Sequence, residues 1–515
     1  MRWVFVRPRA SSPYYDPEMQ EPLGIECLAA AREAAGDRIL ILDATLDGHD
    51  EQRIGRRLAA FEPDAVGMSL TTGGEVPSLE SIYAAAKQSL GGRRVIWIAG
   101  GNFISTEPDR AAELLPADFC LVRFEGERAL EAIAQDWRRG HCPVGTVLCG
   151  EAVDHLDDLP CALRPYARHV IARGWAFNLQ GSRGCCGACR YCASPGMSAI
   201  TGTRWRGRSP GHVAAEIEAI YRDHGGQAFN FVDEDFLGPV LGAEKRAEEF
   251  AEELRRRGLP VVFSIQVRPA TLNERIIDML TSVGLRYVFM GLESDDPEDF
   301  FRWGRPWTED PWRFVRHLRA RGAEVNVGTL LFHPHATLEG IRRFARKLHG
   351  YGLLEYRSAI NRLDAMPGSA CFADAQRAGH VPADALGPQH LPFERREVGE
   401  FYEDLVVALA PLGPPSMHAL CCVPPLLTQI ETGRVPVSTR QRLQEIEEIL
   451  DEAVAGSFFS LLDAYESGSS TDSHVTALRS RNFDVALSGA QQLVAGGFAD
   501  NFDDLRDAIR LDAGI

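Results

Sequence analysis

The sequence predicts an α/β protein that consists of a doubly wound, Rossmann-like domain, a partial (β/α)6 barrel and a helical C-terminal region. Short apolar runs alternate with amphipathic helical patterns over the first 140 residues, and they alternate again between residues 173 and 385. After residue 386 only helical patterns continue. With 515 residues, 45% of them hydrophobic, the chain is long enough for about three domains, each with a core. We expect domains at 1–145, 173–385 and 386–515, with a proline-containing linker at 146–172.

Five strands are expected in the first domain, at 3–6, 39–42, 65–70, 95–99 and 119–122, and the first helix at 24–35. Ligands of a doubly wound sheet lie beyond the carboxyl ends of its strands, so the loops of interest are 69–74, 100–106 and 124–127. Two of them are rich in Gly, Ser or Thr and the third is centred on Gly126, which lets the backbone approach a large ligand. No G-x-G-x-x-G follows the first strand, which argues against a nicotinamide site.

Six strands are expected in the barrel, at 175–179, 228–232, 261–267, 287–290, 324–332 and 358–363, with helices at 213–222, 243–257, 274–283 and 338–349. Functional residues of parallel barrels gather at the carboxyl ends of the strands. This chain has polar side chains there: Asp233, Asp235, Arg268, Glu293, Ser294, His333 and His335. The two histidines are either substrate-facing acid or base groups or exposed turn residues. Amphipathic helices follow at 400–410, 440–455 and 500–509, with a flexible loop at 467–473.

The most informative stretch runs from Gly181 to Cys192, directly after the first barrel strand. Its three cysteines Cys185, Cys189 and Cys192 have the spacing C-x3-C-x2-C on a glycine-rich loop. Three such thiolates can hold three corners of a cubic iron–sulfur cluster and leave the fourth iron open to a small molecule. One alternative is a structural zinc site, but zinc prefers four ligands and only Cys186 lies near enough in sequence to be the fourth. Ordinary buried cysteines are another alternative.

Composition excludes several classes of function. A formal net charge of −17, from 55 basic and 72 acidic residues, gives no support for a nucleic-acid partner. No apolar run has the length of a membrane span and the N-terminus is typical of a strand rather than a signal peptide, so we expect a cytoplasmic protein without a membrane partner. Twelve unevenly spaced cysteines favour thiols and metal ligands over disulfides. Cys421 and Cys422 are either a thiol at the active site or a buried structural pair.

The cysteine loop resembles the cluster-binding signature of the radical S-adenosylmethionine (SAM) enzymes, because Ser182-Arg183-Gly184 precedes the first cysteine and Tyr191 precedes the third. The resemblance implies a [4Fe-4S] cluster whose open iron chelates SAM, and an external one-electron reductant of the flavodoxin or ferredoxin type. It also implies SAM contacts from Tyr191, Asp233, Arg268, Glu293 and Ser294. One departure is the segment 332–337, FHPHAT, which replaces the glycine-rich turn that family members often carry after the fifth strand.

The N-terminal loops resemble the cobalamin-binding domain of one large radical SAM subclass. The matching segments are 22–24, 66–72, 99–103 and 124–127. The resemblance implies cobalamin contacts from Ser69, Thr71, Thr72, Gly100, Gly101, Asn102, Phe103, Glu125 and Gly126. It also implies that the loop 8–21, with Tyr14 and Tyr15, covers one face of the corrin. The alternative is a Rossmann-like domain without cobalamin, as in members that dehydrate or epimerise sugars.

One triplet in this domain resembles part of a cobalt-ligand motif. Asp47-Gly48-His49 matches the start of Asp-x-His-x-x-Gly, but Gln52 stands at the last position and the triplet follows the second strand rather than the first. We therefore expect cobalt to have no histidine ligand from the protein.

These resemblances imply a cobalamin-dependent radical SAM enzyme that acts in a biosynthetic pathway. In the subclass that it resembles, the commonest activity is methylation of an unactivated carbon, here expected on a small molecule. The alternatives are a SAM-radical rearrangement, dehydration or epimerisation without methyl transfer, and a cobalamin or metal carrier without catalysis. The sequence contains no motif that identifies the substrate or individual catalytic residues.

Overall fold

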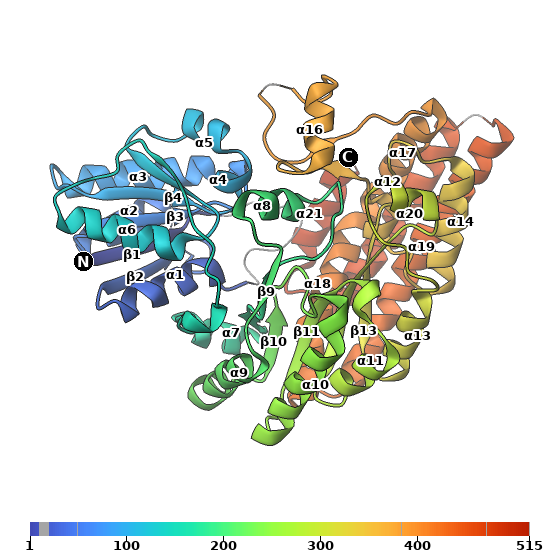
Figure 1. Cartoon of the computed structure of the whole chain (residues 1–515). Coiled ribbons are helices and arrows are strands. Elements are labelled where there is room, and N and C mark those ends of the chain that lie inside the picture. The colour runs from blue at the N-terminus through green and yellow to red at the C-terminus, as the bar shows by residue number, and fades with distance from the viewer. Residues whose placement is uncertain (10–19, 49, 383, 470, 514–515) are drawn as a thin grey trace.

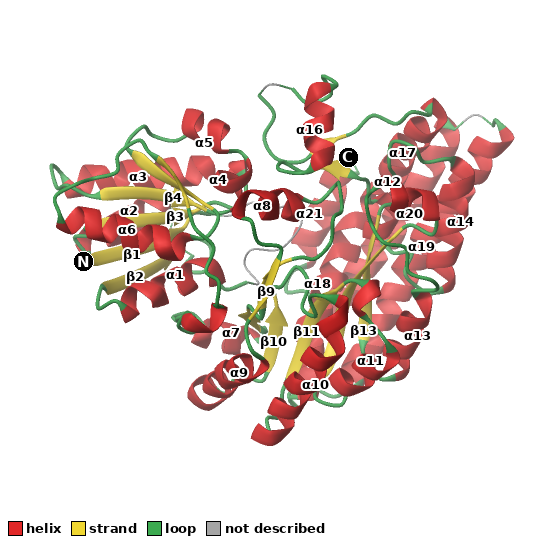
Figure 2. Cartoon of the chain, viewed as in Figure 1, coloured by secondary structure: helices red, strands yellow, loops and turns green. Residues whose placement is uncertain are grey.

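Two parallel sheets and a layer of helices follow one another along the chain (Figures 1 and 2). The structure is a computed structural model, and it describes residues 1–9, 20–48, 50–382, 384–469 and 471–513. Three residues with a prediction lie outside the described residues: Tyr14 and Tyr15, expected to cover the corrin, and His49, expected not to bind cobalt.

The first sheet has the order β2-β1-β3-β4-β5-β6, and all its pairs are parallel. Its strands are β1 Arg2–Arg7, β2 Arg38–Asp43, β3 Ala65–Ser69, β4 Ile96–Gly100, β5 Phe119–Arg123 and β6 Val147–Cys149. The helices are α1 Leu23–Ala34, α2 Glu51–Ala60, α3 Val76–Leu90, α4 Asn102–Thr106, α5 Pro108–Leu114 and α6 Gly126–Arg138.

Helices cover both faces of this sheet, which explains the continuous apolar runs of its strands. Successive residues of β1 belong to different cores: Val4 and Val6 pack with α2 and α3, whereas Trp3 and Phe5 pack with α1 and α6. The five expected strands are present. A sixth, β6, lies within the segment expected as a linker, and its three residues are too few to show a periodic pattern.

The second sheet has the order β13-β12-β11-β10-β7 and is also parallel. Its strands are β7 Phe177–Leu179, β10 Ala228–Phe231, β11 Val262–Val267, β12 Leu285–Glu293 and β13 Glu324–Thr329. The helices from this part of the chain are α7 Ala167–Arg173, α8 Ala193–Thr201, α9 Pro210–His224, α10 Val240–Arg257, α11 Glu274–Thr281, α12 Pro297–Arg302, α13 Trp312–Ala320, α14 Leu338–Gly350 and α15 Tyr356–Ile360.

The sixth barrel strand, expected at 358–363, is reduced to a single parallel bridge between Phe332 and Arg362. Helix α15 occupies the first half of the expected range. A capping box starts that helix, since the Glu355 side chain accepts from the Ser358 backbone and the Ser358 hydroxyl accepts from the Glu355 N–H. These local hydrogen bonds favour the helix over a strand.

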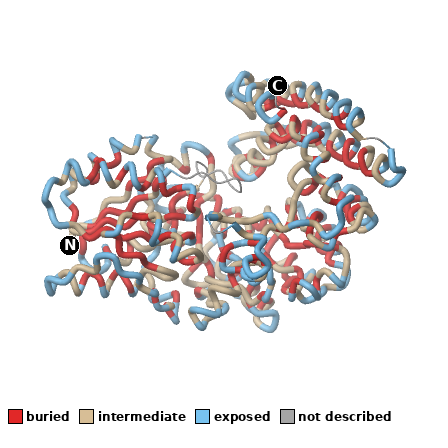
Figure 3. Tube along the Cα trace, turned by 90° about the horizontal axis from the view of Figure 1, so that it is seen from above, coloured by how far each residue is buried: buried red, intermediate tan, exposed pale blue. Residues whose placement is uncertain are grey.

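The C-terminal region is helical, with α17 Arg396–Leu409, α18 Gly413–Glu431, α19 Ser438–Ser467, α20 Asp472–Ala495 and α21 Phe502–Asp512. Before it come the short helix α16 Ala370–Arg377 and an antiparallel pair, β14 Asp364–Ala365 and β15 Gln389–His390. One continuous core joins the barrel to α17–α20, and Figure 3 shows the buried segments running along the strands and the inner sides of these helices.

One helical stretch, Arg396–Glu431, is long and apolar enough to cross a membrane, with a mean hydropathy of 1.5. The sequence was expected to contain no apolar stretch long enough to span a membrane. Apolar side chains of this stretch, including Val398, Phe401 and Leu405, are buried in the core shared with the barrel. A buried core helix meets the same criterion of length and hydropathy, so the stretch is weak support for a membrane span.

The turn between β4 and α4 requires a glycine, so a substitution there tests how much this turn contributes to the stability of the first domain. Gly101 has a φ of 103°, and a Cβ there would lie 2.3 Å from the Leu70 carbonyl oxygen. We expect Gly101→Ala to destabilise this domain by about 1–3 kcal/mol, because both the left-handed backbone and the contact are strained. Gly92→Ala is the matched control, since no atom lies within 4 Å of a Cβ at Gly92. Thermal unfolding of the two variants should separate them, and equal midpoints would contradict the expectation.

Candidate functional site

The cysteine loop begins at a tight ribbon at the carboxyl end of β7. Strand β8 Ser182–Gly184 pairs antiparallel with β9 Trp205–Gly207, and Cys185 follows directly. Gly184 has a φ of 80°, and a Cβ there would lie 1.9 Å from the Arg204 carbonyl oxygen. Only glycine fits this position, so the backbone fixes the direction in which the loop leaves the ribbon.

Two of the three cysteines lie around Gly187. A Cβ on that glycine would be 3.3 Å from Cys185 Sγ and 3.6 Å from Cys189 Sγ. The Gly187 N–H donates to Cys185 Sγ at 3.2 Å. Cys192 lies at the start of α8, and all three cysteines are half-buried. The missing side chain of Gly187 therefore leaves space between two thiols that the loop already turns toward each other.

Burial makes two of these thiols weakly acidic in the absence of a metal. Burial raises the pKa of Cys185 to about 12 and that of Cys192 to about 11. Without a metal they are protonated at neutral pH, and a metal would replace those protons. In the described part of the chain, no three His, Cys, Asp or Glu side chains converge on a single ion.

Asp233 is buried and holds the start of the cysteine loop. Its Oδ2 accepts from the Gly181 N–H at 3.1 Å, and its Oδ1 accepts from the Ser182 hydroxyl at 2.6 Å. Burial raises the pKa of Asp233 to about 6, although these hydrogen bonds oppose the shift. The structure thus shows this residue, expected at the SAM site, bound to the backbone and side chain of the loop.

Arg268 lies against the same loop, and its guanidinium already has partners. Its Nε donates to Asp235 Oδ2 at 2.7 Å and its Nη2 donates to the Gly238 carbonyl oxygen at 2.8 Å. Its Cδ would lie 3.8 Å from a Cβ at Gly187. Within the described residues, Oδ1 of Asp235 is buried without a hydrogen-bond partner. Arg268 therefore lines the space beside the cysteines as half of an ion pair.

Arg305, which the sequence did not single out, connects Tyr191 to Glu293. Its Nη1 donates to the Tyr191 hydroxyl at 2.9 Å and to Glu293 Oε1 at 2.7 Å, and its Nη2 donates to the Gly291 carbonyl oxygen. Glu293 has a φ of 56°, a conformation uncommon for a residue with a side chain. Burial raises the pKa of Tyr191 well above its usual value, so the phenol stays neutral. These contacts bring two of the expected SAM residues together beside the cysteines.

The loop that carries Arg305 also covers the cysteine loop. The Arg190 N–H donates to the Trp303 carbonyl oxygen at 2.9 Å, and the rings of Tyr191 and Trp303 meet edge to face with centroids 6.0 Å apart. The only sequence signal for this loop is Gly304-Arg305-Pro306, whose glycine has a φ of 65°.

Ser294 and His333 are connected through Asp299. The Ser294 hydroxyl donates to Asp299 Oδ2 at 2.6 Å, and His333 Nε2 lies 3.4 Å from the same oxygen. His333 is buried, whereas His335 is exposed and forms an ion pair with Glu394 at 2.7 Å. A cavity of about 320 Å³ lies between α12 and α14 and is lined by Ser294, Asp299 and both histidines. His333 is therefore a buried group of this cavity rather than an exposed turn residue.

The loops expected to contact cobalamin lie beyond β3, β4 and β5. Glu75, buried beneath the first of them, accepts from the Thr71 N–H at 2.7 Å. Burial raises the pKa of Glu75 to about 7. Ser69, Thr72, Gly100, Asn102 and Phe103 lie in the same loops or at the start of α4. Thr71 and Asn102 are exposed at these loops, whereas Phe103 is buried in the core of the first domain.

Glu125, expected to contact cobalamin, forms ion pairs with the ribbon of the cysteine loop. It contacts Arg183 Nη1 at 3.0 Å and also pairs with Arg206. Gly126, beside it, packs against Leu28 of α1. The two arginines more than offset the effect of burial and lower the pKa of Glu125, so the carboxylate is charged.

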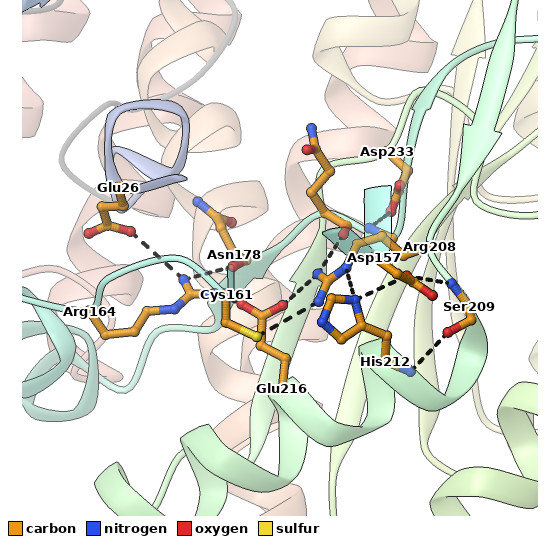
Figure 4. A network of polar contacts seen from close by, with 12 residues as sticks. Glu26, Asp157, Cys161, Arg164, Asn178, Arg208, Ser209, His212, Glu216 and Asp233 are labelled. Atoms are coloured by element: carbon orange, nitrogen blue, oxygen red, sulfur yellow. Dashed lines mark hydrogen bonds and ion pairs between the residues drawn. The ribbon is translucent and has the colours of Figure 1, made fainter. Parts of the chain in front are cut away.

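A second ionic network joins the first domain to the barrel (Figure 4). Arg164 donates to Glu21 at 3.0 Å and to Glu216 at 2.9 Å, and Glu216 also accepts from Arg208. Burial, together with Glu21, raises the pKa of Glu26 well above its usual value, which favours its neutral form. Arg164 and Arg208 are thus both paired with carboxylates at this boundary.

Cys422 and His418 have a structural role in α18. His418 Nε2 lies 2.8 Å from the Phe498 carbonyl oxygen, and Cys422 Sγ donates to the same oxygen at 3.5 Å. Burial raises the pKa of Cys422 to about 12, so its thiol is protonated. These contacts attach α18 to the end of α20.

Family models and sequence relatives match most of the first two domains. The B12 binding domain model matches residues 18–134, and the Radical SAM superfamily model matches residues 179–348. An uncharacterized methyltransferase of Pyrococcus horikoshii is 25% identical over 349 residues, which cover 64% of this chain and 73% of that protein. The hopanoid C-3 methylase of Methylococcus capsulatus is 26% identical over 297 residues, or 54% of each protein. The chain thus spans about half the length of the latter.

Two solved structures share the fold. The cobalamin-dependent SAM radical enzyme OxsB, with aqua-cobalamin bound, aligns with a TM-score of 0.76 at 14% identity and covers 100% of this chain and 84% of its own. The radical SAM methyltransferase TsrM from Kitasatospora setae aligns with a TM-score of 0.59 at 18% identity, over 73% of this chain and 75% of its own. The expected fold class is confirmed.

The raised pKa of Asp233 predicts a pH dependence of stability. Between its unfolded pKa near 4 and its folded pKa of about 6, the folded protein binds the proton more tightly than the unfolded chain. This contribution to stability is therefore present at low pH and lost as the pH rises through 6. We expect the wild type to lose about 1–2 kcal/mol from this group between pH 5 and 7.5.

Asp233→Asn removes the titrating group, so its stability should change less than that of the wild type over the same pH range. Asp223→Asn, at a fully exposed position paired with Arg222, is the control and should follow the wild type. Urea unfolding at the two pH values measures the difference, and parallel curves for Asp233→Asn and the wild type would contradict it.

Proposed function

Because the chain belongs to the radical SAM enzymes that carry a cobalamin-binding domain, we propose that it methylates an unactivated carbon of a small molecule. The observation that carries the proposal is the three-cysteine loop, attached by ion pairs to the loops of the B12-binding domain. Relatives named as a methyltransferase and a C-3 methylase support methyl transfer over the other radical reactions.

The residues of the site divide by the cofactor that each would hold. Cys185, Cys189 and Cys192 would bind the cluster, and a Cβ at Gly187 would occupy the space between two of them. Tyr191, Arg268, Glu293 and Ser294 would bind SAM, with Asp233 fixing the loop. Ser69, Thr71, Thr72, Gly100, Gly101, Asn102, Phe103 and Gly126 would bind cobalamin. We assign Glu125, whose oxygens have arginine partners, to a different role.

When bound, the cluster and SAM supply a 5'-deoxyadenosyl radical that abstracts a hydrogen atom, and cobalamin supplies the methyl group. The protein keeps these groups in place. Arg305 holds Tyr191 and Glu293 in one arrangement beside the cysteines. Asp233 fixes the Gly181 N–H and the Ser182 hydroxyl, so the loop keeps its shape when the thiols lose their protons. An external donor of the flavodoxin or ferredoxin type would supply the electron.

The assignment of cluster ligands predicts a clear difference between neighbouring cysteines. Cys185→Ala, Cys189→Ala and Cys192→Ala should each lose the iron–sulfur cluster and the formation of 5'-deoxyadenosine, because a cubic cluster cannot replace the missing thiolate. Cys186→Ala should keep both, although Cys186 lies in the same loop with similar exposure. Iron and sulfide analysis of anaerobically reconstituted protein, with product analysis after reduction, measures the outcome. A full cluster in Cys189→Ala would refute the assignment.

An isotope label on the methyl group of SAM distinguishes methyl transfer from the other radical reactions. With methyl-labelled SAM, we expect the corrinoid-containing protein to form labelled methylcobalamin and S-adenosylhomocysteine, and 5'-deoxyadenosine on further reduction. Mass spectrometry and the corrinoid absorption spectrum report these products. A protein that takes up no corrinoid and forms 5'-deoxyadenosine without S-adenosylhomocysteine would instead perform a rearrangement, dehydration or epimerisation.

A further inference from the structure

Two arginines of the β8–β9 ribbon reach the loop after β5 in the first domain. Arg183 and Arg206 face each other across the ribbon. Arg183 pairs with Glu125 at 3.0 Å and with Glu127 at 2.6 Å. Arg206 pairs with Glu125 and donates to the Val153 carbonyl oxygen. Two carboxylates of one domain thus bind two guanidiniums of the other.

These four side chains are largely removed from water. Their exposed fractions are 14% for Arg183, 15% for Arg206, 12% for Glu125 and 8% for Glu127. Desolvation offsets much of the attraction within buried ion pairs, so such groups contribute little net stability and much directional constraint. A guanidinium with several fixed N–H donors is suited to bridging two carboxylates at defined angles. The geometry therefore indicates a contact that orients two parts more than it stabilises them.

A continuous chain of contacts connects this cluster to the loops on either side. Ser105 of α4 donates from its hydroxyl to the Gly101 carbonyl oxygen at 2.9 Å and accepts from the Phe124 N–H at 2.9 Å. Glu125 follows Phe124 in the chain, and the Glu125–Arg183 pair leads to the ribbon. Cys185 lies two residues beyond Arg183. The glycine loop after β4 and the cysteine loop are therefore joined by side chains and backbone without an intervening flexible segment.

We propose that Arg183, Arg206, Glu125 and Glu127 are positioning residues that set the distance between the cobalamin loops and the cluster loop. The inference rests on the proposed function, in which SAM at the cluster loop and cobalamin at the first domain exchange a methyl group. That exchange breaks the sulfonium carbon–sulfur bond, forms the cobalt–carbon bond with the electron pair of cob(I)alamin, and releases S-adenosylhomocysteine. Reductive cleavage of SAM to 5'-deoxyadenosine needs the cluster loop and the SAM-binding residues of the barrel, but not the first domain. The ion pairs should therefore affect the first reaction and not the second.

Two variants disturb the contact without removing bulk. Glu127→Gln keeps the shape of the side chain but removes the charge that pairs with Arg183, and Arg183→Lys keeps a charge but cannot bridge two carboxylates. Glu218→Gln is the matched control, because Glu218 also accepts from a largely buried arginine, Arg257, but within the barrel between α9 and α10. All proteins are reconstituted with cluster and corrinoid, and their iron and cobalt contents are compared first.

The two reactions are then measured without any substrate. We expect methylcobalamin formation from cob(I)alamin and SAM to fall about 10-fold to 100-fold in Glu127→Gln and Arg183→Lys, since a small misplacement of reacting groups is enough for such a loss. Formation of 5'-deoxyadenosine under a chemical reductant should stay within about twofold of the wild type. Glu218→Gln should match the wild type in both reactions.

Two measurements that do not depend on turnover test the link itself. Amide hydrogen exchange at residues 183–186 should be faster in both variants than in the wild type, already in the protein without cofactors. In the loaded protein, the magnetic interaction between cob(II)alamin and the reduced cluster should change in the EPR spectrum. Glu218→Gln should show neither effect.

The inference is overturned if both reactions fall equally, if neither falls, or if hydrogen exchange at the ribbon is unchanged. A wrong proposed function would give a different result, because the wild type itself would then bind no corrinoid or form no S-adenosylhomocysteine. The hydrogen-exchange result would still show whether the ion pairs fix the ribbon to the first domain.

Discussion

The structure depends on the pairing of charges at the boundary between its two parallel sheets. The carboxyl ends of both sheets carry the candidate functional loops. Bringing these loops together buries the charged side chains that lie between them. The buried arginines at this boundary form ion pairs. Arg164 pairs with Glu21 and Glu216. Arg183 pairs with Glu125 and Glu127. Glu26, beside Arg164, is driven toward its neutral form instead. An unpaired charge at either place would cost several kcal/mol, so the pairing limits how the two domains can lie relative to each other.

The same principle governs the cysteine loop at shorter range. Asp233 and Asp235 lie in the segment that follows β10, and they bind different neighbours. Asp233 accepts from the backbone of the cysteine loop, and Asp235 accepts from Arg268. Arg305 links the tyrosine between two cysteines to the end of β12. The groups that surround the thiols are thus held by one another before any cofactor binds, which reduces the reorganisation needed when it does.

Much of this architecture follows from the sequence because the signals are local. The strands of the first sheet, the cysteine spacing and the glycine loop after β4 were all predictable from residues close together in the chain. Arg305 was not, because its contact with Tyr191 joins residues 114 positions apart. The ion pairs of Glu125 with Arg183 and Arg206 were not predictable for a similar reason, because a carboxylate after a strand can face a ligand or another domain and the sequence does not distinguish them. The prediction of a sixth barrel strand was wrong because the capping box of Glu355 and Ser358 stabilises the helix α15 where the sequence pattern indicated a strand. Helices α18 and α20 were missed because internal prolines in one and a weakly amphipathic pattern in the other obscure the helical period.

The segment that contains α16 lies at the top of Figure 1, between the first domain and the C-terminal helices. It contacts the first domain where Gly368 approaches Thr106 and Leu386 approaches Gly73, and it contacts the cysteine loop where the Cys371 N–H donates to the Arg190 carbonyl oxygen. Yet its own core is small, with Ala365, Phe372 and Ala375 as its fully buried members. A core of this size cannot hold the segment alone, so its stability depends on these contacts with the first domain and the cysteine loop. Because few buried side chains hold this segment, we expect it to open locally at a lower free energy than either of the two large cores.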